Sequence, residues 1–169
     1  MEQEIENKTE IKKRLIDYYF KNKIKIFAVV LSLISIFILS IIFIYNKEKK
    51  NILIADKYLK AGIFLSNNNK DDAKNLYEEV VLSKNKFYSI LALNVIIEKD
   101  LVKDKEKILN FFKEIENLNI SEEKKDLLMF KKALYLIKIS KNEDGKKLLN
   151  NLKDKNSKLK PLIEEIIAN

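Results

Sequence analysis

The feature that most limits how this chain can fold is a long segment without charge close to its N-terminus. No Asp, Glu, Lys or Arg occurs in the 21 residues from Ile26 to Asn46, which are mostly Ile, Leu, Val, Phe and Ser. A helix rises about 1.5 Å per residue, so roughly 20 residues cross a hydrocarbon core about 30 Å thick. Ser32, Ser35 and Ser40 fit such a helix because their hydroxyls can donate to carbonyls one turn earlier. The segment therefore predicts a transmembrane helix over residues 26–46.

Two alternatives would use the same apolar segment differently. A buried core helix seldom runs this long without a charge, and a secretory signal peptide has an apolar core of about 7–15 residues. The sequence from Tyr45 to Lys50 contains no small-residue cleavage site. We therefore expect an uncleaved signal anchor. The residues expected at the membrane interfaces are Tyr18, Tyr19, Lys23, Lys25, Phe27 and Tyr45.

The distribution of basic residues favours a cytoplasmic N-terminus. Seven Lys or Arg residues lie in the 20 positions before the segment, and five lie in the 20 positions after it. Cytoplasmic flanks carry the larger number, and a long C-terminal part can be translocated regardless of its charge. We therefore expect a cytoplasmic juxtamembrane segment over residues 1–25 and an extracytoplasmic domain over residues 47–169.

The composition excludes most kinds of chemistry. The chain of 169 residues contains no Cys and no His, so disulfides, Cys- or His-ligated metals, thiol nucleophiles and a Ser-His-Asp triad are excluded. Its two Gly residues are isolated, so no phosphate-binding or dinucleotide-binding glycine loop is present. The net charge of +8 includes a single Arg and is spread thinly, unlike the focused basic stripe of a nucleic-acid site.

Adjacent carboxylates are the remaining candidates for acid–base chemistry. Glu78 with Glu79, and Glu122 with Glu123, are neighbours in the sequence, so on a helix they point about 100° apart. Such pairs usually belong to a solvated helix face. We therefore expect a protein that is not an enzyme and has no cofactor, metal, nucleic acid or small-molecule substrate.

The C-terminal part of the sequence is helical in pattern, and its helix starts recur. We expect helices to begin near Asn51, Asp71, Lys86, Asp104, Ser121, Glu143 and Ser157. Alternate helix starts, near residues 51, 86, 121 and 157, are about 35 residues apart. This spacing is close to the 34-residue unit of tetratricopeptide repeats. The predicted fold is all-α, with an N-terminal transmembrane helix followed by a degenerate tetratricopeptide-like stack of helical hairpins. A generic α-helical bundle is an alternative that accounts for the same spacing.

Small residues 12 positions apart also fit a repeat, because paired helices approach closely where side chains are small. Two of the three units contain such a pair, and the four helix-packing positions are Ala61 with Ala73 and Ala133 with Gly145. The middle unit departs from the pattern, since its candidates at this spacing, Ile96 and Ile108, are large.

Local signals predict several helix ends. Asn69 and Asp72 form a pair that resembles a capping box, and Ser121 precedes two glutamates as an N-cap would. The polar run from Asn142 to Gly145 predicts a break between helices. Pro161 is tolerated in the first turn of the last helix.

Two segments carry apolar faces suited to a helical stack. Leu127, Phe130, Leu134 and Ile137 recur at helical spacing and predict one buried face. The segment from Phe87 to Ile97 is apolar nearly all round, which predicts a helix with neighbours on several sides.

Two motifs carry a resemblance to a known family. The tail ends in DYYFKNK (Asp17 to Lys23), and the domain contains KNKFYSILALNVIIEKDLVKDKEKI (Lys84 to Ile108). With its order of tail, span and helical domain, the chain resembles the YfgM family of bacterial inner-membrane proteins. This resemblance implies a single-pass type II ancillary subunit of the SecYEG translocon with a periplasmic tetratricopeptide-like domain. It also implies a membrane-anchored periplasmic chaperone of the prolyl-isomerase type as a partner.

Two functions therefore compete. The first is a membrane-anchored helical protein-interaction module that is associated with the Sec translocon and links it to periplasmic folding factors. The second is a single-pass envelope signalling or scaffold protein that is not tied to secretion. Both have an anchor in the lipid bilayer and a helical domain, so proteins that co-purify in mild detergent would separate them.

Overall fold

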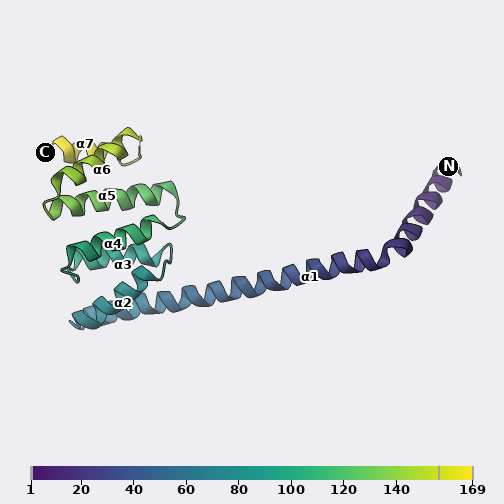
Figure 1. Ribbon diagram of the computed structural model, residues 1–169, viewed down its shortest axis with the longest axis horizontal. Helices are drawn as coiled ribbons and strands as arrows, with labels where there is room; N and C mark the ends of the chain where they lie inside the picture. The colour runs from purple at the N-terminus through teal and green to yellow at the C-terminus, as the bar shows by residue number, and fades with distance from the viewer. Residues whose placement is uncertain (1, 156, 169) are drawn as a thin grey trace. The chain divides into compact units, whose positions relative to one another are not determined.

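The computed structural model describes residues 2–155 and 157–168, and every regular element in these ranges is an α-helix. The all-helical prediction is confirmed. The helices, labelled in Figure 1, are α1 (Glu2–Ser66), α2 (Lys70–Leu82), α3 (Tyr88–Glu98), α4 (Lys105–Glu116), α5 (Glu122–Lys138), α6 (Asn142–Asp154) and α7 (Lys160–Ala168).

The chain divides into two compact units, Met1–Lys49 and Lys50–Asn169. The first unit consists of the N-terminal part of α1 and includes the apolar segment. The second unit contains the last turns of α1 together with α2 to α7, and Figure 1 shows α2 to α7 following one another in chain order. Because short loops join these helices, neighbours in the sequence are also neighbours in space.

The predicted helix start at Asn51 is wrong. α1 continues through this position as one uninterrupted helix that ends at Ser66. The segment from Tyr45 to Asn51 contains no Gly or Pro, and its four central residues are Lys and Glu, which are good helix formers. The charged stretch therefore does not end the helix, although the boundary between the two compact units falls within it.

The second unit has two clusters of buried side chains. The first cluster draws on α1 to α5 and includes Phe111 and Phe112 of α4, which are nearly inaccessible to solvent. The second cluster joins α5, α6 and α7, and it includes Phe130 and Ile163. Burial of each such side chain contributes roughly 1.5–3 kcal/mol. α5 contributes side chains to both clusters and so connects them.

Several predicted helix ends are confirmed. Asn69 caps α2: its side chain accepts from the Asp72 backbone N–H at 3.3 Å and donates to the Asp72 carboxylate at 2.7 Å. Pro161 lies in the first turn of α7. Ser121 directly precedes α5, although its side chain makes no capping hydrogen bond there.

The break predicted from Asn142 to Gly145 is wrong, because these residues form the first turn of α6. The chain instead turns at Ser140, which has a φ of 67°. This left-handed conformation lets the Lys141 N–H donate to the Leu136 carbonyl at 2.9 Å and closes the end of α5. A serine thus takes the place that glycine usually fills at such an end, which hides the turn in the sequence.

The buried face of α5 also differs from the predicted one. Of the four predicted residues, Phe130 is buried, whereas Leu127 and Leu134 are 41% and 37% exposed. The helix instead buries Leu128, Ala133, Tyr135 and Leu136. α5 packs against α4 and α6, so its buried surface is wider than one stripe and is rotated away from the predicted face.

The prediction for α3 is confirmed. Phe87, the first residue of the predicted segment, is exposed, but all residues from Tyr88 to Ile97 are buried or partly buried, as expected for a helix with neighbours on several sides. α3 packs against α2 and α4. Its buried Ser89 donates to the Val80 carbonyl of α2 at 2.9 Å, which satisfies a polar side chain inside the core.

Candidate interaction surfaces

The apolar part of α1 is long and apolar enough to cross a membrane. Its most apolar window is wholly exposed within the structure, so it does not serve as a core helix for the described part of this chain. Two of its serines are satisfied internally, as predicted. The hydroxyls of Ser35 and Ser40 donate to the carbonyls of Leu31 and Ile36, each at 2.9 Å.

The residues predicted for the membrane interfaces are exposed along α1. They are Tyr18, Tyr19, Lys23, Lys25, Phe27 and Tyr45. The four aromatic side chains are each more than half accessible to solvent. Their rings and the two ammonium groups are therefore free to meet lipid headgroups, where amphipathic aromatic and basic side chains are favoured.

The small residues lie where helices meet. Ala61, Ala73 and Ala133 are fully buried, and Gly145 is buried as well. A Cβ atom at Gly145 would lie 2.8 Å from the Ala133 carbonyl oxygen and 2.6 Å from the Cγ1 atom of Ile137. These distances are shorter than real packing allows, so α5 and α6 approach each other at this glycine.

The middle unit fills the corresponding places with large side chains. Ile96 of α3 and Ile108 of α4 are both buried in the first cluster. α3 and α4 therefore bury large side chains at the two positions where the predicted repeat would have small ones. The sequence pattern predicts this difference, because its small residues 12 positions apart are missing from the middle unit.

Polar contacts recur between residues about one repeat length apart. Three side-chain contacts link residues 34 or 35 positions apart along the chain. They are Asn85 to Asn51 at 2.9 Å, Lys141 to Glu106 at 2.9 Å, and Lys158 to Glu123. Each contact joins a helix to the segment that leads into the second helix after it along the chain.

The adjacent glutamates take part in contacts between helices. Glu78 accepts from Lys107 of α4 at 2.7 Å, whereas Glu79 accepts from Lys57 of α1 at 2.6 Å. The two carboxylates thus point to different helices, as residues about 100° apart should. Among the described residues, no group of three or more Asp or Glu side chains is placed to hold a metal ion.

The second adjacent pair, Glu122 and Glu123, lies on the surface of α5. Glu122 pairs with Lys125 within the helix at 3.0 Å, and Glu123 pairs with Lys158. The hydrogen bond and charge of Lys158 hold the pKa of Glu123 below its usual value. A carboxylate with a lowered pKa stays ionised near neutrality, where it can keep its ion pair with Lys158.

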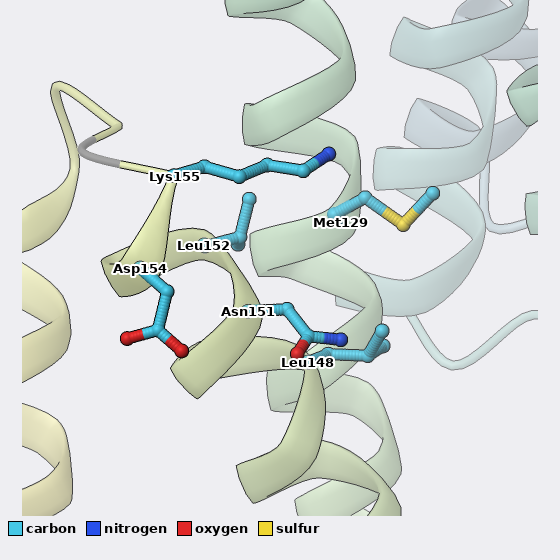
Figure 2. A pocket seen from close by; sticks show the side chains of 6 residues that line it. All are labelled: Met129, Leu148, Asn151, Leu152, Asp154 and Lys155. Carbon is cyan, nitrogen blue, oxygen red and sulfur yellow. The ribbon is translucent and has the colours of Figure 1, made fainter.

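An open pocket of about 500 Å³ lies beside α6. Figure 2 shows the six residues that line it. Five of its six labelled residues belong to α6 or directly follow it, and Met129 comes from α5. The pocket combines apolar side chains such as Leu148 with one charge of each sign, Asp154 and Lys155. It lacks a focused charge that would select a ligand.

A second pocket, of about 580 Å³, lies where α4, α5 and α6 meet. Among its lining residues, Lys132 pairs with Glu116 at 2.7 Å, and both side chains are partly buried. The pair satisfies its own charges, so this pocket also offers little to a ligand.

A third pocket, of about 190 Å³, is a groove between α3 and α5. Asn94, Ile97 and Glu98 line it from α3, and Lys131, Leu134, Tyr135 and Lys138 line it from α5. None of these residues was predicted to form a site. The signal was present as Lys131 and Lys138 on either side of Leu134, but the prediction of a buried Leu134 concealed it.

No protein-family model matches this chain, and comparisons with curated proteins and with solved structures found no match. The interaction surfaces are therefore interpreted from their own geometry and from the sequence.

Replacing Tyr77 by phenylalanine should weaken the loss of stability at alkaline pH. Burial, and to a smaller extent the nearby Tyr58, raises the pKa of Tyr77 above its usual value of 10.0. Above about pH 10 the unfolded chain therefore loses this proton more readily than the folded chain, and the free energy of unfolding falls as pH rises. Below about pH 10 the protonated Tyr77 makes its full contribution to the free energy of unfolding.

The measurement is urea unfolding of the wild type and the Tyr77→Phe variant at about pH 9 and about pH 11. The variant should lose less stability than the wild type over this interval. Tyr18→Phe, at an exposed position, is the control and should follow the wild type. Equal losses for the Tyr77→Phe variant and the wild type would contradict the assigned role of Tyr77.

Proposed function

We propose that this protein is a membrane-anchored protein-interaction module. Residues 26–46 supply a single transmembrane helix, and the unit from Lys50 to Asn169 supplies a tetratricopeptide-like stack that binds other proteins. No catalytic step is assigned to it. A tethered binder meets its partner at an effective concentration of about millimolar, so modest affinity suffices.

The recurrence of contacts at 34 or 35 residues carries this proposal. This spacing agrees with the spacing of the predicted helix starts. It is an independent observation, because it comes from side-chain contacts and not from the sequence pattern. In a repeat stack each unit contacts its neighbours in the same way, so such pairs should recur once per unit. Stacks of helical hairpins generally present an extended surface to protein ligands.

The close-contact positions support the same arrangement. Ala61 with Ala73, and Ala133 with Gly145, are buried on paired helices at the spacing of a tetratricopeptide unit. α7 follows the third hairpin as a terminal helix and contributes the buried Ile163. The large residues in the middle unit make the repeat degenerate.

The partners proposed from the family resemblance are the Sec translocon and a membrane-anchored periplasmic folding factor. We assign the span and its flank to the translocon, and the helical stack to the folding factor. This assignment requires the N-terminus to lie in the cytoplasm of a bacterial cell and the stack to lie in the periplasm.

The proposed orientation is tested by labelling with an impermeant maleimide. The chain has no cysteine, so a single cysteine at the exposed Lys146 gives a signal without background. It should react from the outer side of the inner membrane, whereas a cysteine at Asn22 should react only after that membrane is broken. The reverse pattern would contradict the orientation.

An anchor exchange tests the proposed partners. Residues 1–46 are replaced by an unrelated single span of the same orientation, and crosslinking to the translocon and to the folding factor is measured. Crosslinks to the translocon should be lost and those to the folding factor should remain. Full translocon crosslinking after the exchange would contradict the role of the span. Absence of both crosslinks in the unmodified protein would favour an envelope scaffold that is not tied to secretion.

A further inference from the structure

The groove between α3 and α5 has an apolar floor that is not covered by another helix of the described chain. Tyr135 is almost fully buried beneath it and Ile97 is partly buried, whereas Leu134 is 37% exposed. The volume of about 190 Å³ corresponds to roughly six water molecules of about 30 Å³ each. A space of this size accommodates one large apolar side chain.

The groove carries cations that its own helices do not neutralise. Within the described residues, neither Lys131 nor Lys138 forms an ion pair or a hydrogen bond with another side chain. The single acidic residue of the lining is Glu98. Asp100, just beyond α3, pairs with Lys103, whose hydrogen bond is the main cause of its lowered pKa, and the charge of Lys138 lowers that pKa as well. The groove therefore has an unbalanced positive charge beside exposed apolar surface.

The spacing of the two lysines sets the form of ligand that fits. They are seven residues apart on α5, about 10.5 Å along the helix axis at 1.5 Å per residue. An extended peptide covers that length in about three residues at roughly 3.3 Å each. Two carboxylates about three residues apart, with an apolar residue between them, would therefore meet the two ammonium groups and the floor together. The Asn94 amide can donate to the backbone of such a peptide.

We propose that the groove between α3 and α5 binds an extended acidic peptide segment of a partner protein, with one large apolar side chain over Leu134 and carboxylates on Lys131 and Lys138. This inference deepens the proposed function by naming the chemistry of the partner. Its test needs no translocon, so its failure is distinguishable from failure of the anchor exchange.

The test measures fluorescence anisotropy of a fluorescein-labelled peptide, GSEELFEEGS, with the full chain in uncharged detergent. The peptide should bind, and raising the salt concentration should weaken binding because the contacts are ionic. The counterpart GSKKLFKKGS should not bind. Binding of both peptides with equal affinity, or no binding of the acidic peptide at about 1 mM protein, would overturn the proposal.

Charge reversal locates the site. The double variant Lys131→Glu/Lys138→Glu should bind at least about tenfold more weakly, the equivalent of about 1.4 kcal/mol. The matched control, Lys146→Glu/Lys153→Glu, makes the same charge change on α6 and should keep wild-type affinity. An equal loss of affinity in both double variants would show that binding depends on overall charge and would overturn the assignment of the peptide to this groove.

Two further measurements separate specific binding from misfolding and from general attraction of anions. Circular dichroism should show the same melting temperature for both double variants, and if charge reversal prevents folding, Lys131→Gln/Lys138→Gln replaces it with the same expected loss. The neutral variant Leu134→Ser should weaken binding with little change in its salt dependence. An oligouridine that binds equally well and competes with the peptide would make the groove a general anion site and overturn peptide recognition.

Discussion

On the proposed anchoring by residues 26–46, two lysines at the centre of the apolar segment should release the protein from the membrane. In the variant Ile36→Lys/Phe37→Lys, each added charge costs about 2.5–3.5 kcal/mol at the middle of a transmembrane helix. The two together cost roughly 5–7 kcal/mol, enough to shift the chain from the inserted to the uninserted state. The fraction of protein that resists alkaline carbonate extraction measures this shift and should fall steeply.

The matched control places the same two charges at the ends of the segment. In Asn22→Lys/Asn46→Lys the ammonium groups lie near the headgroups, where lysine is favoured. This variant should remain in the membrane pellet like the wild type. Equal retention of the central and terminal variants would show that residues 26–46 do not hold the protein in the membrane.

The two glycines should respond to alanine with opposite signs. Gly145→Ala places a Cβ atom 2.8 Å from the Ala133 carbonyl oxygen, a backbone atom that cannot move without shifting α5. We expect overpacking to lower the free energy of unfolding by roughly 1–3 kcal/mol. The Cβ of Gly62→Ala would be 3.5 Å from the Tyr77 hydroxyl, an ordinary contact.

Gly62 lies in a helix interior, so alanine there should raise the free energy of unfolding by roughly 0.5–1 kcal/mol. Urea unfolding of the full chain in mild detergent, followed by circular dichroism, measures both variants. Gly145→Ala is the sharper of the two tests. If it were as stable as the wild type, α5 and α6 would not be in contact at this glycine.

The features that sequence predicted best depend on local signals. The helix start at Asn69 could be predicted because an Asn side chain and an Asp three residues later satisfy each other within one turn. The length of the apolar segment likewise needs no knowledge of distant residues. Helices α2 to α7 therefore begin close to their predicted positions.

The features that sequence missed depend on distant contacts or on unusual turn residues. The turn after α5 was misplaced because it uses Ser140 with positive φ, where glycine is the usual signal. The face of α5 was misassigned because leucines occur on both its buried and its exposed sides. Only the positions of α4 and α6 decide which of them are covered.

The lysines of the groove were missed for a different reason. Lys and Arg together make up 33 of the 169 residues, so two more lysines on a helix carry little information by themselves. They became informative only when the structure showed which lysines line a groove. What distinguishes Lys131 and Lys138 is their place beside Leu134 in the lining of the groove between α3 and α5.

Because the second unit has two separate buried clusters, its parts should unfold locally at different free energies. The smaller cluster, which holds Leu149, Leu152 and Ile163, can separate while the larger one around Phe111 stays closed. Parts of a protein with fewer buried contacts open at lower free energy, and their amide protons exchange sooner with solvent. The C-terminal end of the stack is therefore where a protease would first gain access. The segments nearest the anchor should be the last to lose their structure.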